Sequence, residues 1–290
     1  MSFRIGFLCS GDLGLNTLKK IQEEVSPQFI FTDKNSEGII EFAENNSIPL
    51  FVGNPRKKNT YDFLKQFQTD LIFSINYLFI IERDLLAHPF CAINLHGSLL
   101  PKYRGRTPHI WAIINGETET GITAHKMEEG CDTGNIFLQR KIPINWNETG
   151  ADILMKFRKI YPEIVLEVIS RFGENDLKQV FQDESKATYF WKRTPEDGKI
   201  CWDWHKERIF NWVRAQANPY PGAFSYLEEK KIIIDEIEFS DHGFDCRIPN
   251  GTIIEKYPHV LVKTPNGIVS LSSIRNQEMV QFLEVGKKFD

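Results

Sequence analysis

The chain has 290 residues, of which 41% are hydrophobic and 26% are charged, a composition typical of globular proteins. This balance excludes a disordered, collagen-like or disulfide-scaffold chain, and the length suits two domains. The formal net charge of −4 provides no overall basic field that would draw the chain to nucleic acid or to an anionic membrane.

In its first half the chain alternates short apolar runs with segments in which apolar residues recur at threes and fours. The runs predict strands at 4–9, 29–32, 50–52, 71–75 and 91–95. The periodic segments predict helices near 15–25, 39–43, 61–67 and 82–86. This order is typical of an α/β fold with an open, mostly parallel, Rossmann-like sheet.

The second half continues this pattern and then changes character. It predicts a helix at 107–115, strands at 121–127 and 136–144, and a long amphipathic helix at 151–172. After a helix at 206–216, short segments separated by turn signals predict a small antiparallel, OB-like β domain. These segments are 223–227, 231–239, 251–257, 259–264 and 268–274. We therefore expect a first domain over 1–192 and a second over 193–290.

The cysteines are few and scattered, without the pairs or histidine neighbours of a zinc site. An odd number of scattered cysteines is typical of reduced thiols in the cytoplasm. The longest apolar stretch, 71–81, is too short to cross a bilayer, and Asp12 interrupts the apolar N-terminal run before it could form a signal-peptide core. We expect a cytoplasmic protein that holds no metal and contacts no membrane.

Polar side chains stand where one core strand ends. Asn94 and His96 are two residues apart at the end of the strand predicted at 91–95, so their side chains share one face. Open α/β sheets bind ligands at the carboxyl ends of their strands, and Asp132 lies in a turn after the next predicted strand. Amide and imidazole N–H groups can hold a developing oxyanion, while a carboxylate can fix an imidazole tautomer and raise its pKa. An Asn, a His and an Asp that meet in this way suit acyl transfer.

Nearby residues have other interpretations. Ser98 lies two residues after His96, but no GxSxG elbow surrounds it, so we expect it to stabilise its loop rather than act as a nucleophile. His109 and His125 have no second ligand at metal spacing, and we expect them to be structural or to line the substrate site.

The sequence around these residues resembles the folate-dependent formyltransferases. The likeness rests on NLHGSLLPKYRG at 94–105, NGE at 115–117, TGIT at 120–123 and DTG at 132–134. It continues in KRTPED at 192–197, VRA at 213–215 and NPYPGAF at 218–224, which are similar to members with an OB-like C-terminal domain. Members of this family transfer the formyl group of N10-formyltetrahydrofolate to an amine. Their catalytic Asn, His and Asp correspond to Asn94, His96 and Asp132.

The resemblance implies that a neutral amine attacks the formyl carbon, and that Asn94 and His96 hold the oxyanion of the tetrahedral intermediate. His96 and water would move a proton from the amine toward N10, with Asp132 as the orienting residue. The folate would lie along the loop after strand 71–75 and the loop 127–132, mostly on backbone groups. The residues expected to contact it are Tyr77, Leu78, Ile80, Glu129 and Cys131.

The motifs favour a nucleotide-linked amino sugar as the amine substrate. They are similar to those of sugar N-formyltransferases, which act on TDP-, UDP- or GDP-linked 3- or 4-amino-dideoxy sugars in O-antigen and lipopolysaccharide biosynthesis. Cations at the cleft and an aromatic side chain that can stack on the base are expected to hold such a substrate. These are Lys102, Arg104, Trp191 and Arg193. We also expect a homodimer.

Two other acceptors stay open. Methionyl-tRNA formyltransferases carry a long basic loop after the second strand, whereas 32–38 is short and charge-balanced, so we expect no nucleic acid partner. Formyltetrahydrofolate hydrolases usually carry an N-terminal regulatory domain, whereas this sequence starts at the first strand of the expected catalytic domain.

Overall fold

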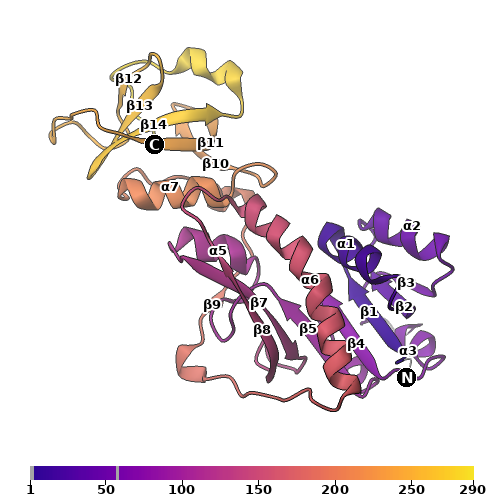
Figure 1. Ribbon diagram of the computed structural model, residues 1–290. Coiled ribbons are helices and arrows are strands. Elements are labelled where there is room, and N and C mark those ends of the chain that lie inside the picture. The colour runs from indigo at the N-terminus through magenta and orange to yellow at the C-terminus, as the bar shows by residue number, and fades with distance from the viewer. Residues whose placement is uncertain (1–2, 57–58) are drawn as a thin grey trace. The chain divides into compact units, whose positions relative to one another are not determined.

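The computed structural model describes residues 3–56 and 59–290 (Figure 1). A seven-stranded sheet organises the first part of the chain. Its strands are β1 (Ile5–Cys9), β2 (Pro27–Thr32), β3 (Leu50–Val52), β4 (Leu71–Ile75), β5 (Cys91–His96), β7 (Glu119–Lys126) and β8 (Ile136–Pro143). Their order is β3-β2-β1-β4-β5-β7-β8, parallel from β3 to β5, with β7 antiparallel to β5. The expected α/β class and mostly parallel sheet are confirmed.

Helices connect most of these strands. They are α1 (Gly11–Ile21), α2 (Glu37–Asn45), α3 (Asn59–Leu64), α4 (Arg83–Leu86), α5 (Pro108–Ile114), α6 (Gly150–Gly173) and α7 (Lys206–Ala215). In α1, Leu18 and Ile21 are buried while Lys19 and Lys20 are exposed, which is the apolar stripe of a helix packed on a sheet. Helix α6 lies against β5, since the Tyr161 hydroxyl donates to the carbonyl oxygen of Leu95 at 3.3 Å.

A second, antiparallel sheet of five strands follows α7. Its strands are β10 (Ala223–Leu227), β11 (Lys230–Ser240), β12 (Ile253–Glu255), β13 (Val260–Thr264) and β14 (Gly267–Ile274), in the order β10-β11-β14-β13-β12. In β11, Ile232 and Ile234 point into the core, and a register shift at Glu236 lets Ile237 do so as well. The predicted antiparallel C-terminal sheet is confirmed, and β10 and β12 form its two edges.

Short elements escape sequence analysis. Strands β6 (Arg104–Gly105) and β9 (Tyr189–Phe190) pair in parallel, and three 3-10 turns lie at Glu184–Lys186, Pro195–Gly198 and Gln277–Phe282. Gly105 has a φ of +103°, and a Cβ there would lie 2.2 Å from the carbonyl oxygen of Phe190, so this close pairing requires glycine. Two-residue strands have no periodicity from which a sequence could predict them.

The chain divides into two compact units. Unit 1 comprises Met1–Gly105, Thr120–Ile142 and Met155–Phe190, and unit 2 comprises Arg106–Glu119, Pro143–Leu154 and Trp191–Asp290. The chain therefore passes repeatedly from one unit to the other, and the domain boundary after residue 192 stays a proposal. Within the described residues, every helix is too short or too polar to cross a bilayer.

Candidate active site

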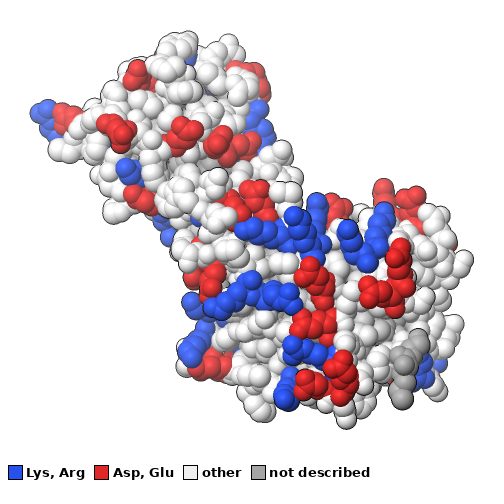
Figure 2. All heavy atoms as spheres, in the orientation of Figure 1, with Lys and Arg blue, Asp and Glu red and all other residues white. Residues whose placement is uncertain are grey.

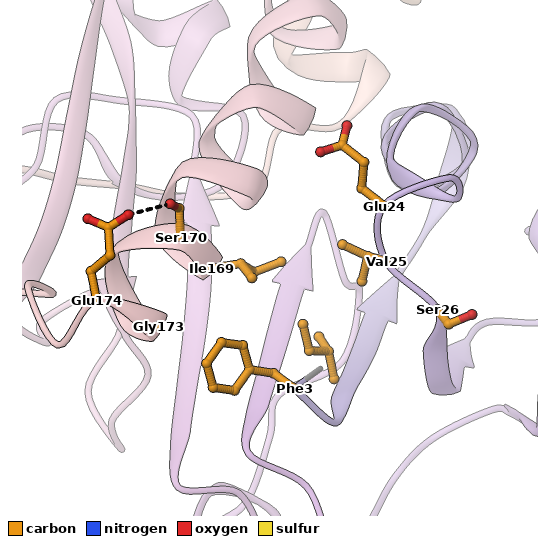
Figure 3. Close-up of a pocket in the computed structure, with 9 residues that line it drawn as sticks. Phe3, Glu24, Val25, Ser26, Ile169, Ser170, Gly173 and Glu174 are labelled. Atoms are coloured by element: carbon orange, nitrogen blue, oxygen red, sulfur yellow. Dashed lines mark hydrogen bonds between the residues drawn. The ribbon is translucent and has the colours of Figure 1, made fainter. Parts of the chain in front are cut away.

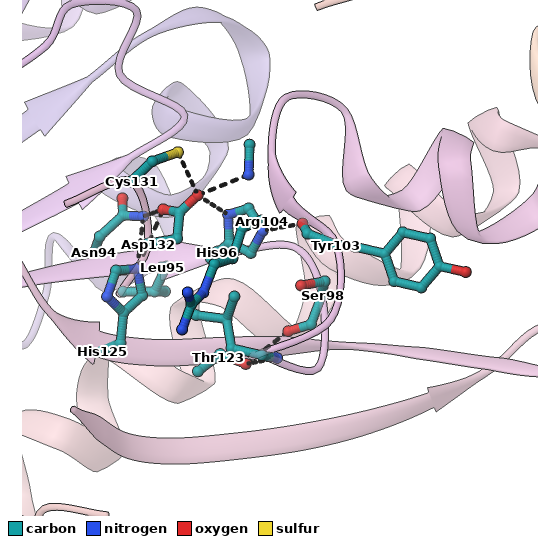
Figure 4. Close-up of polar contacts among 12 residues, drawn as sticks. Asn94, Leu95, His96, Ser98, Tyr103, Arg104, Thr123, His125, Cys131 and Asp132 are labelled. Atoms are coloured by element: carbon teal, nitrogen blue, oxygen red, sulfur yellow. Dashed lines mark hydrogen bonds and ion pairs between the residues drawn. The ribbon is translucent and has the colours of Figure 1, made fainter. Parts of the chain in front are cut away.

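Strand β5 carries the two polar residues that sequence analysis singled out (Figure 4). Ile93 and Leu95 point into the core, and the intervening positions place Asn94 and His96 on the other face. His96 is 6% exposed. Strand β7 runs beside them, with His125 opposite Asn94 and Thr123 opposite His96. Both predicted residues thus lie at the carboxyl end of a central strand.

Asp132 comes to the same place from the turn between β7 and β8. Its Oδ1 atom lies 3.4 Å from Nδ2 of Asn94, and its Oδ2 atom lies 3.6 Å from Nδ1 of His96. The backbone N–H of Gly105 donates to Oδ2 at 2.9 Å. Asp132 has a φ of +53°, a left-handed conformation that aspartate tolerates better than most residues. The structure therefore brings Asn94, His96 and Asp132 together as expected.

Burial and neighbouring groups shift the pKa values of Asp132 and His96 in opposite directions. Burial by itself would raise the pKa of Asp132, but His96 and the Gly105 N–H hold that pKa below its usual range. Burial lowers the pKa of His96, while Asp132 acts against this shift. The sequence predicted a raised pKa for His96, which is wrong because desolvation of the buried ring outweighs the carboxylate.

The hydrogen on His96 is placed by a backbone group. Nε2 of His96 lies 2.8 Å from the carbonyl oxygen of Tyr103, which can only accept. In the neutral ring, Nε2 therefore carries the hydrogen and Nδ1 faces Asp132. The prediction that Asp132 fixes the tautomer of His96 is wrong. The contact from Nε2 to the Tyr103 carbonyl oxygen, at 2.8 Å, is much shorter than the contact from Nδ1 to Asp132, at 3.6 Å.

A second histidine belongs to the cluster. Nε2 of His125 lies 3.1 Å from Nδ2 of Asn94 and 3.5 Å from Oδ1 of Asp132. The side chain is 3% exposed, and its Nδ1 lies 2.8 Å from the carbonyl oxygen of Lys126. From the sequence, His125 is expected to be structural or to line the substrate site. Its position two residues after the TGIT motif at 120–123, on the strand predicted next to the one that carries Asn94, was the available signal.

The loop after β5 is held by hydroxyl groups. The Ser98 hydroxyl donates to the carbonyl oxygen of Lys102 at 2.6 Å, and the Thr123 hydroxyl donates to the carbonyl oxygen of Ser98 at 2.6 Å. Ser98 is 1% exposed. These bonds place Ser98 in the loop's internal framework, which agrees with the stabilising role expected for it.

Arg104, a predicted substrate contact, is buried and engaged within unit 1. Its guanidinium donates to both carboxylate oxygens of Glu184, at 2.6 and 2.8 Å, and to the side-chain oxygen of Gln182 at 2.7 Å. The side chain is 0% exposed. We therefore correct the expectation that Arg104 binds a diphosphate, since its donors already have protein partners.

Gln182 extends this network to the turn that carries Asp132. Its amide nitrogen donates to the carbonyl oxygens of Asp132 and Gly134, at 2.8 and 2.7 Å. Gln182 cannot be found from the sequence, because it follows α6 in an irregular segment without a motif. Arg104 and Gln182 thus support the backbone of the Asp132 turn.

The predicted folate contacts fall into two groups. Leu78 and Ile80 are 42% and 68% exposed, and Glu129 and Cys131 are exposed on the Asp132 turn. Tyr77 is instead buried among the aromatic core of the sheet, and burial raises the pKa of its hydroxyl. A contact from Tyr77 to a folate would have to come from its backbone, because its side chain is enclosed in the core.

The other predicted substrate contacts differ in exposure. Lys102 of unit 1 is exposed, and Trp191 of unit 2 is 84% exposed. In unit 2, the guanidinium of Arg193 lies 5.0 Å from the ring centroid of Trp111 and 4.4 Å from that of Trp212. It donates to the carbonyl oxygen of Asp197 at 2.8 Å. The expectation that Arg193 binds a diphosphate is therefore corrected, since its guanidinium makes these contacts within unit 2.

A cavity of about 490 Å³ lies at the amino end of strand β1, away from the strand ends that carry Asn94 and His96 (Figure 3). Phe3 and Ile5 at the amino end of β1, Val25 after α1 and Ile169 near the end of α6 form its apolar lining, with Glu24 and Glu174 at its rim. None of the predicted site residues lines this cavity.

Fold and site together define an α/β protein with an amide, an imidazole and a carboxylate clustered at the carboxyl edge of its main sheet. Residues 7–169 match the formyl transferase family, and residues 192–285 match the formyl transferase C-terminal domain. The chain belongs to the formyl transferase family.

Solved structures with this fold include sugar and tRNA formyltransferases. WlaRD, a sugar 3N-formyl transferase crystallised with dTDP and 5-N-formyl-THF, is 22% identical with a TM-score of 0.72, over 95% of this chain and 99% of that one. The N-formyltransferase from Helicobacter canadensis, in complex with folinic acid and dTDP-3-aminofucose, is 20% identical with a TM-score of 0.74, over 94% and 99%. Methionyl-tRNA formyltransferase from Clostridium thermocellum is 21% identical with a TM-score of 0.60, over 83% and 95%. At these identities the likeness establishes the fold alone.

Proposed function

We propose that the protein transfers the formyl group of N10-formyltetrahydrofolate to the amine of a nucleotide-diphosphate-linked amino-dideoxy sugar. The observation that carries this proposal is the part-buried cluster of Asn94, His96 and Asp132 in a chain of the formyl transferase family. The cluster supplies N–H donors for a carbonyl oxygen that gains negative charge, and an imidazole that can carry a proton.

Each member of the cluster has a distinct proposed role. Asn94 stabilises the developing charge on the formyl oxygen, and His96 can join it once Nδ1 carries a proton, because its Nε2–H is already donated to the Tyr103 carbonyl oxygen. His96, whose pKa is lowered by burial, is neutral at neutral pH and can accept a proton from the attacking amine through Nδ1. Asp132 stays ionised and stabilises the imidazolium once the proton arrives, because its carboxylate lies 3.6 Å from that nitrogen.

The residues near the cluster suit a folate. Leu78 and Ile80 offer exposed apolar surface to a ring system, and the Asp132 turn offers Glu129 and Cys131 at its surface. When bound, N10-formyltetrahydrofolate supplies an activated formyl carbon. The chain's own residues would position that carbon against Asn94 and His96.

A sugar nucleotide as the acceptor is supported by two relatives whose chains are matched by this one over nearly their whole length. They were crystallised with dTDP or with dTDP-3-aminofucose, and each is covered to 99%. In this chain, Lys102 and Trp191 stay candidates for the diphosphate and the base, because both are exposed. Arg104 and Arg193 are no longer candidates for binding the diphosphate, because their guanidinium groups contact other residues of the protein.

The methionyl-tRNA alternative has less support. Binding RNA requires clustered Lys and Arg side chains that neutralise several phosphates. Figure 2 shows Lys and Arg side chains interspersed with Asp and Glu over the face that it presents, and the net charge is −4. A formyltetrahydrofolate hydrolase is the third candidate, and it needs only water as acceptor.

A direct assay separates these candidates. Purified protein is incubated with N10-formyltetrahydrofolate and, in parallel, with dTDP-, UDP- and GDP-linked 3- and 4-amino-dideoxy sugars, with methionyl-tRNA, and with no acceptor. We expect formylation of one sugar nucleotide and an increased melting temperature with the matching nucleoside diphosphate. Formylated methionyl-tRNA without any sugar product would favour the tRNA enzyme, and rapid loss of the formyl group without acceptor would favour the hydrolase.

Further aspects belong to the same proposal. We propose that the protein acts in the cytoplasm, in O-antigen or lipopolysaccharide synthesis, and as a homodimer. Cytoplasmic action is supported by the five cysteines, which form no disulfide with one another. Light scattering of the purified protein measures its oligomeric state, and a monomer over a wide concentration range would overturn that part.

A further inference from the structure

We propose that His125 is a positioning residue, which holds the side-chain amide of Asn94 through Nε2 while its own hydrogen sits on Nδ1. The proposal rests on the proposed formyl transfer, because Asn94 matters only if the cluster stabilises a reacting oxygen. It adds a second histidine to the set of three residues from which the function was argued.

The donors and acceptors around His125 define its tautomer. Nδ1 lies 2.8 Å from the carbonyl oxygen of Lys126, and a carbonyl can only accept, so Nδ1 carries a hydrogen. In the neutral ring Nε2 then has a lone pair. That lone pair faces Nδ2 of Asn94 at 3.1 Å, and an amide nitrogen can only donate. Oδ1 of Asp132 is a more distant neighbour of Nε2, at 3.5 Å, so the nearest partner of each ring nitrogen is the one that this tautomer requires.

The backbone keeps these partners in place. Asn94 and His125 are directly opposite on antiparallel strands β5 and β7, so their side chains lie on the same face of the sheet. The Lys126 N–H donates to the carbonyl oxygen of Asn135 at 2.8 Å, which closes the β7–β8 connection at this residue. With 3% exposure, His125 is shielded from water that could replace either contact.

The two contacts of the Asn94 amide nitrogen are unequal. Nδ2 of Asn94 lies 3.1 Å from Nε2 of His125 and 3.4 Å from Oδ1 of Asp132. Because hydrogen bonds weaken as they lengthen, the contact to Asp132 is the weaker one and can be exchanged for a contact to an oxygen of a bound substrate. The shorter contact to His125 therefore holds the amide plane in position.

A pair of substitutions tests this role. His125→Gln keeps an acceptor near the position of Nε2, whereas His125→Leu removes it at similar volume. We expect His125→Leu to lower kcat about 10- to 100-fold with KM for both substrates changed less than about threefold, and His125→Gln to stay within about fivefold of the wild type. His88→Leu, at the part-buried histidine beside Thr69, is the control for loss of a histidine elsewhere in unit 1.

Two kinetic outcomes would overturn the proposal. If His125→Gln loses as much activity as His125→Leu, the imidazole itself acts in proton transfer. If His125→Leu keeps wild-type kcat, the residue is only part of the core. Active-site concentration is measured by binding of 5-formyltetrahydrofolate, so that misfolded protein does not count as a kinetic loss.

A spectroscopic measurement is independent of catalysis. Nitrogen-15 NMR of the wild-type protein at about pH 8, where an ordinary histidine is neutral, distinguishes the two tautomers of His125. We expect hydrogen on Nδ1, and hydrogen on Nε2 would contradict the proposal. If the wild type formylates no acceptor, the proposed function fails while this result stands, so the two failures are distinguishable.

Discussion

His96 donates its Nε2–H to the carbonyl oxygen of Tyr103 at 2.8 Å. This bond joins the imidazole to the loop that follows its own strand, so the loop's conformation controls the ring. The Tyr103 N–H in turn donates to the hydroxyl of Thr188 at 2.8 Å, which fastens the loop to the segment after α6. In the proposed mechanism, the nitrogen of His96 that is left for proton transfer is consequently Nδ1, which faces Asp132.

Removing the imidazole of His96 or the charge of Asp132 is expected to abolish most turnover. We predict that His96→Ala and Asp132→Asn each lower kcat by about 10²- to 10⁴-fold, because proton transfer and charge stabilisation act on the transition state. Binding of 5-formyltetrahydrofolate, measured by titration, is expected to change little. Asp176→Asn, at an exposed acid paired with Lys178, serves as control. Near-normal turnover of His96→Ala at saturating substrate would make His96 a structural residue.

Gln182 is expected to matter although it touches no reacting group. Gln182→Leu leaves the carbonyl oxygens of Asp132 and Gly134 without their donor and removes a partner of Arg104. We predict a loss of about 1–3 kcal/mol in unfolding free energy, measured with urea, since each unpaired buried group has a desolvation cost. kcat is expected to fall more than the affinity for folate, because the Asp132 turn shifts. An unchanged kcat would show that the turn keeps its shape without Gln182.

Gly134 is expected to admit no side chain. A Cβ there would lie 2.0 Å from the carbonyl oxygen of Lys126, which is the acceptor for His125. We predict that Gly134→Ala costs about 1–3 kcal/mol of stability and lowers kcat, because backbone must move to relieve the contact. Gly243→Ala is the matched control, since a Cβ at Gly243 meets nothing within 4 Å. Equal melting temperatures for the two variants would contradict this prediction.

His109 is expected to make unit 2 sensitive to acid. Burial lowers the pKa of His109 to about 4, and its Nε2 contacts the Tyr220 hydroxyl at 2.8 Å. The unfolded chain binds a proton near pH 6.5, so the contribution of neutral His109 is fully present above that pH and is lost as pH falls toward about 4. The loss amounts to at most about 3 kcal/mol.

Urea denaturation of His109→Gln at several pH values measures this effect. The variant keeps a polar partner for Tyr220 but does not titrate, so its stability is expected to fall less between neutral pH and about pH 4. His259→Gln, at an exposed histidine, is expected to behave as the wild type. Parallel curves for His109→Gln and the wild type would contradict the prediction.

Long periodic segments made most of the fold predictable. The strand ending at His96 and the long helix α6 were expected within a residue or two of their bounds, because alternation and apolar spacing extend over whole elements. The pairing of Arg104 with Tyr189 in β6 and β9 was not, since two residues carry no period. The proximity of Asn94, His96 and Asp132 followed from strand ends meeting at one edge of the sheet.

Individual side-chain roles were less predictable, because burial is decided by distant segments. Arg104 and Arg193 look like surface cations in sequence, yet one is enclosed by residues 80 positions away and the other lies between two indole rings. Tyr77 was expected to contact the folate, but the aromatic core of the sheet encloses its side chain. No local pattern distinguishes a cation that meets solvent from one that meets a carboxylate.

The repeated passage of the chain between its two units limits how the protein can be cut. A fragment over 193–290 would lack Trp111, which stacks on Arg193, and Trp146, which lies parallel to Phe210 with ring centroids 4.9 Å apart. Both tryptophans come from the segments Arg106–Glu119 and Pro143–Leu154, which lie far upstream in the sequence. A single nick between Phe190 and Trp191 would therefore leave two polypeptides that each hold part of unit 2. Domain exchange with a relative must transplant those two inner segments together with the C-terminal region.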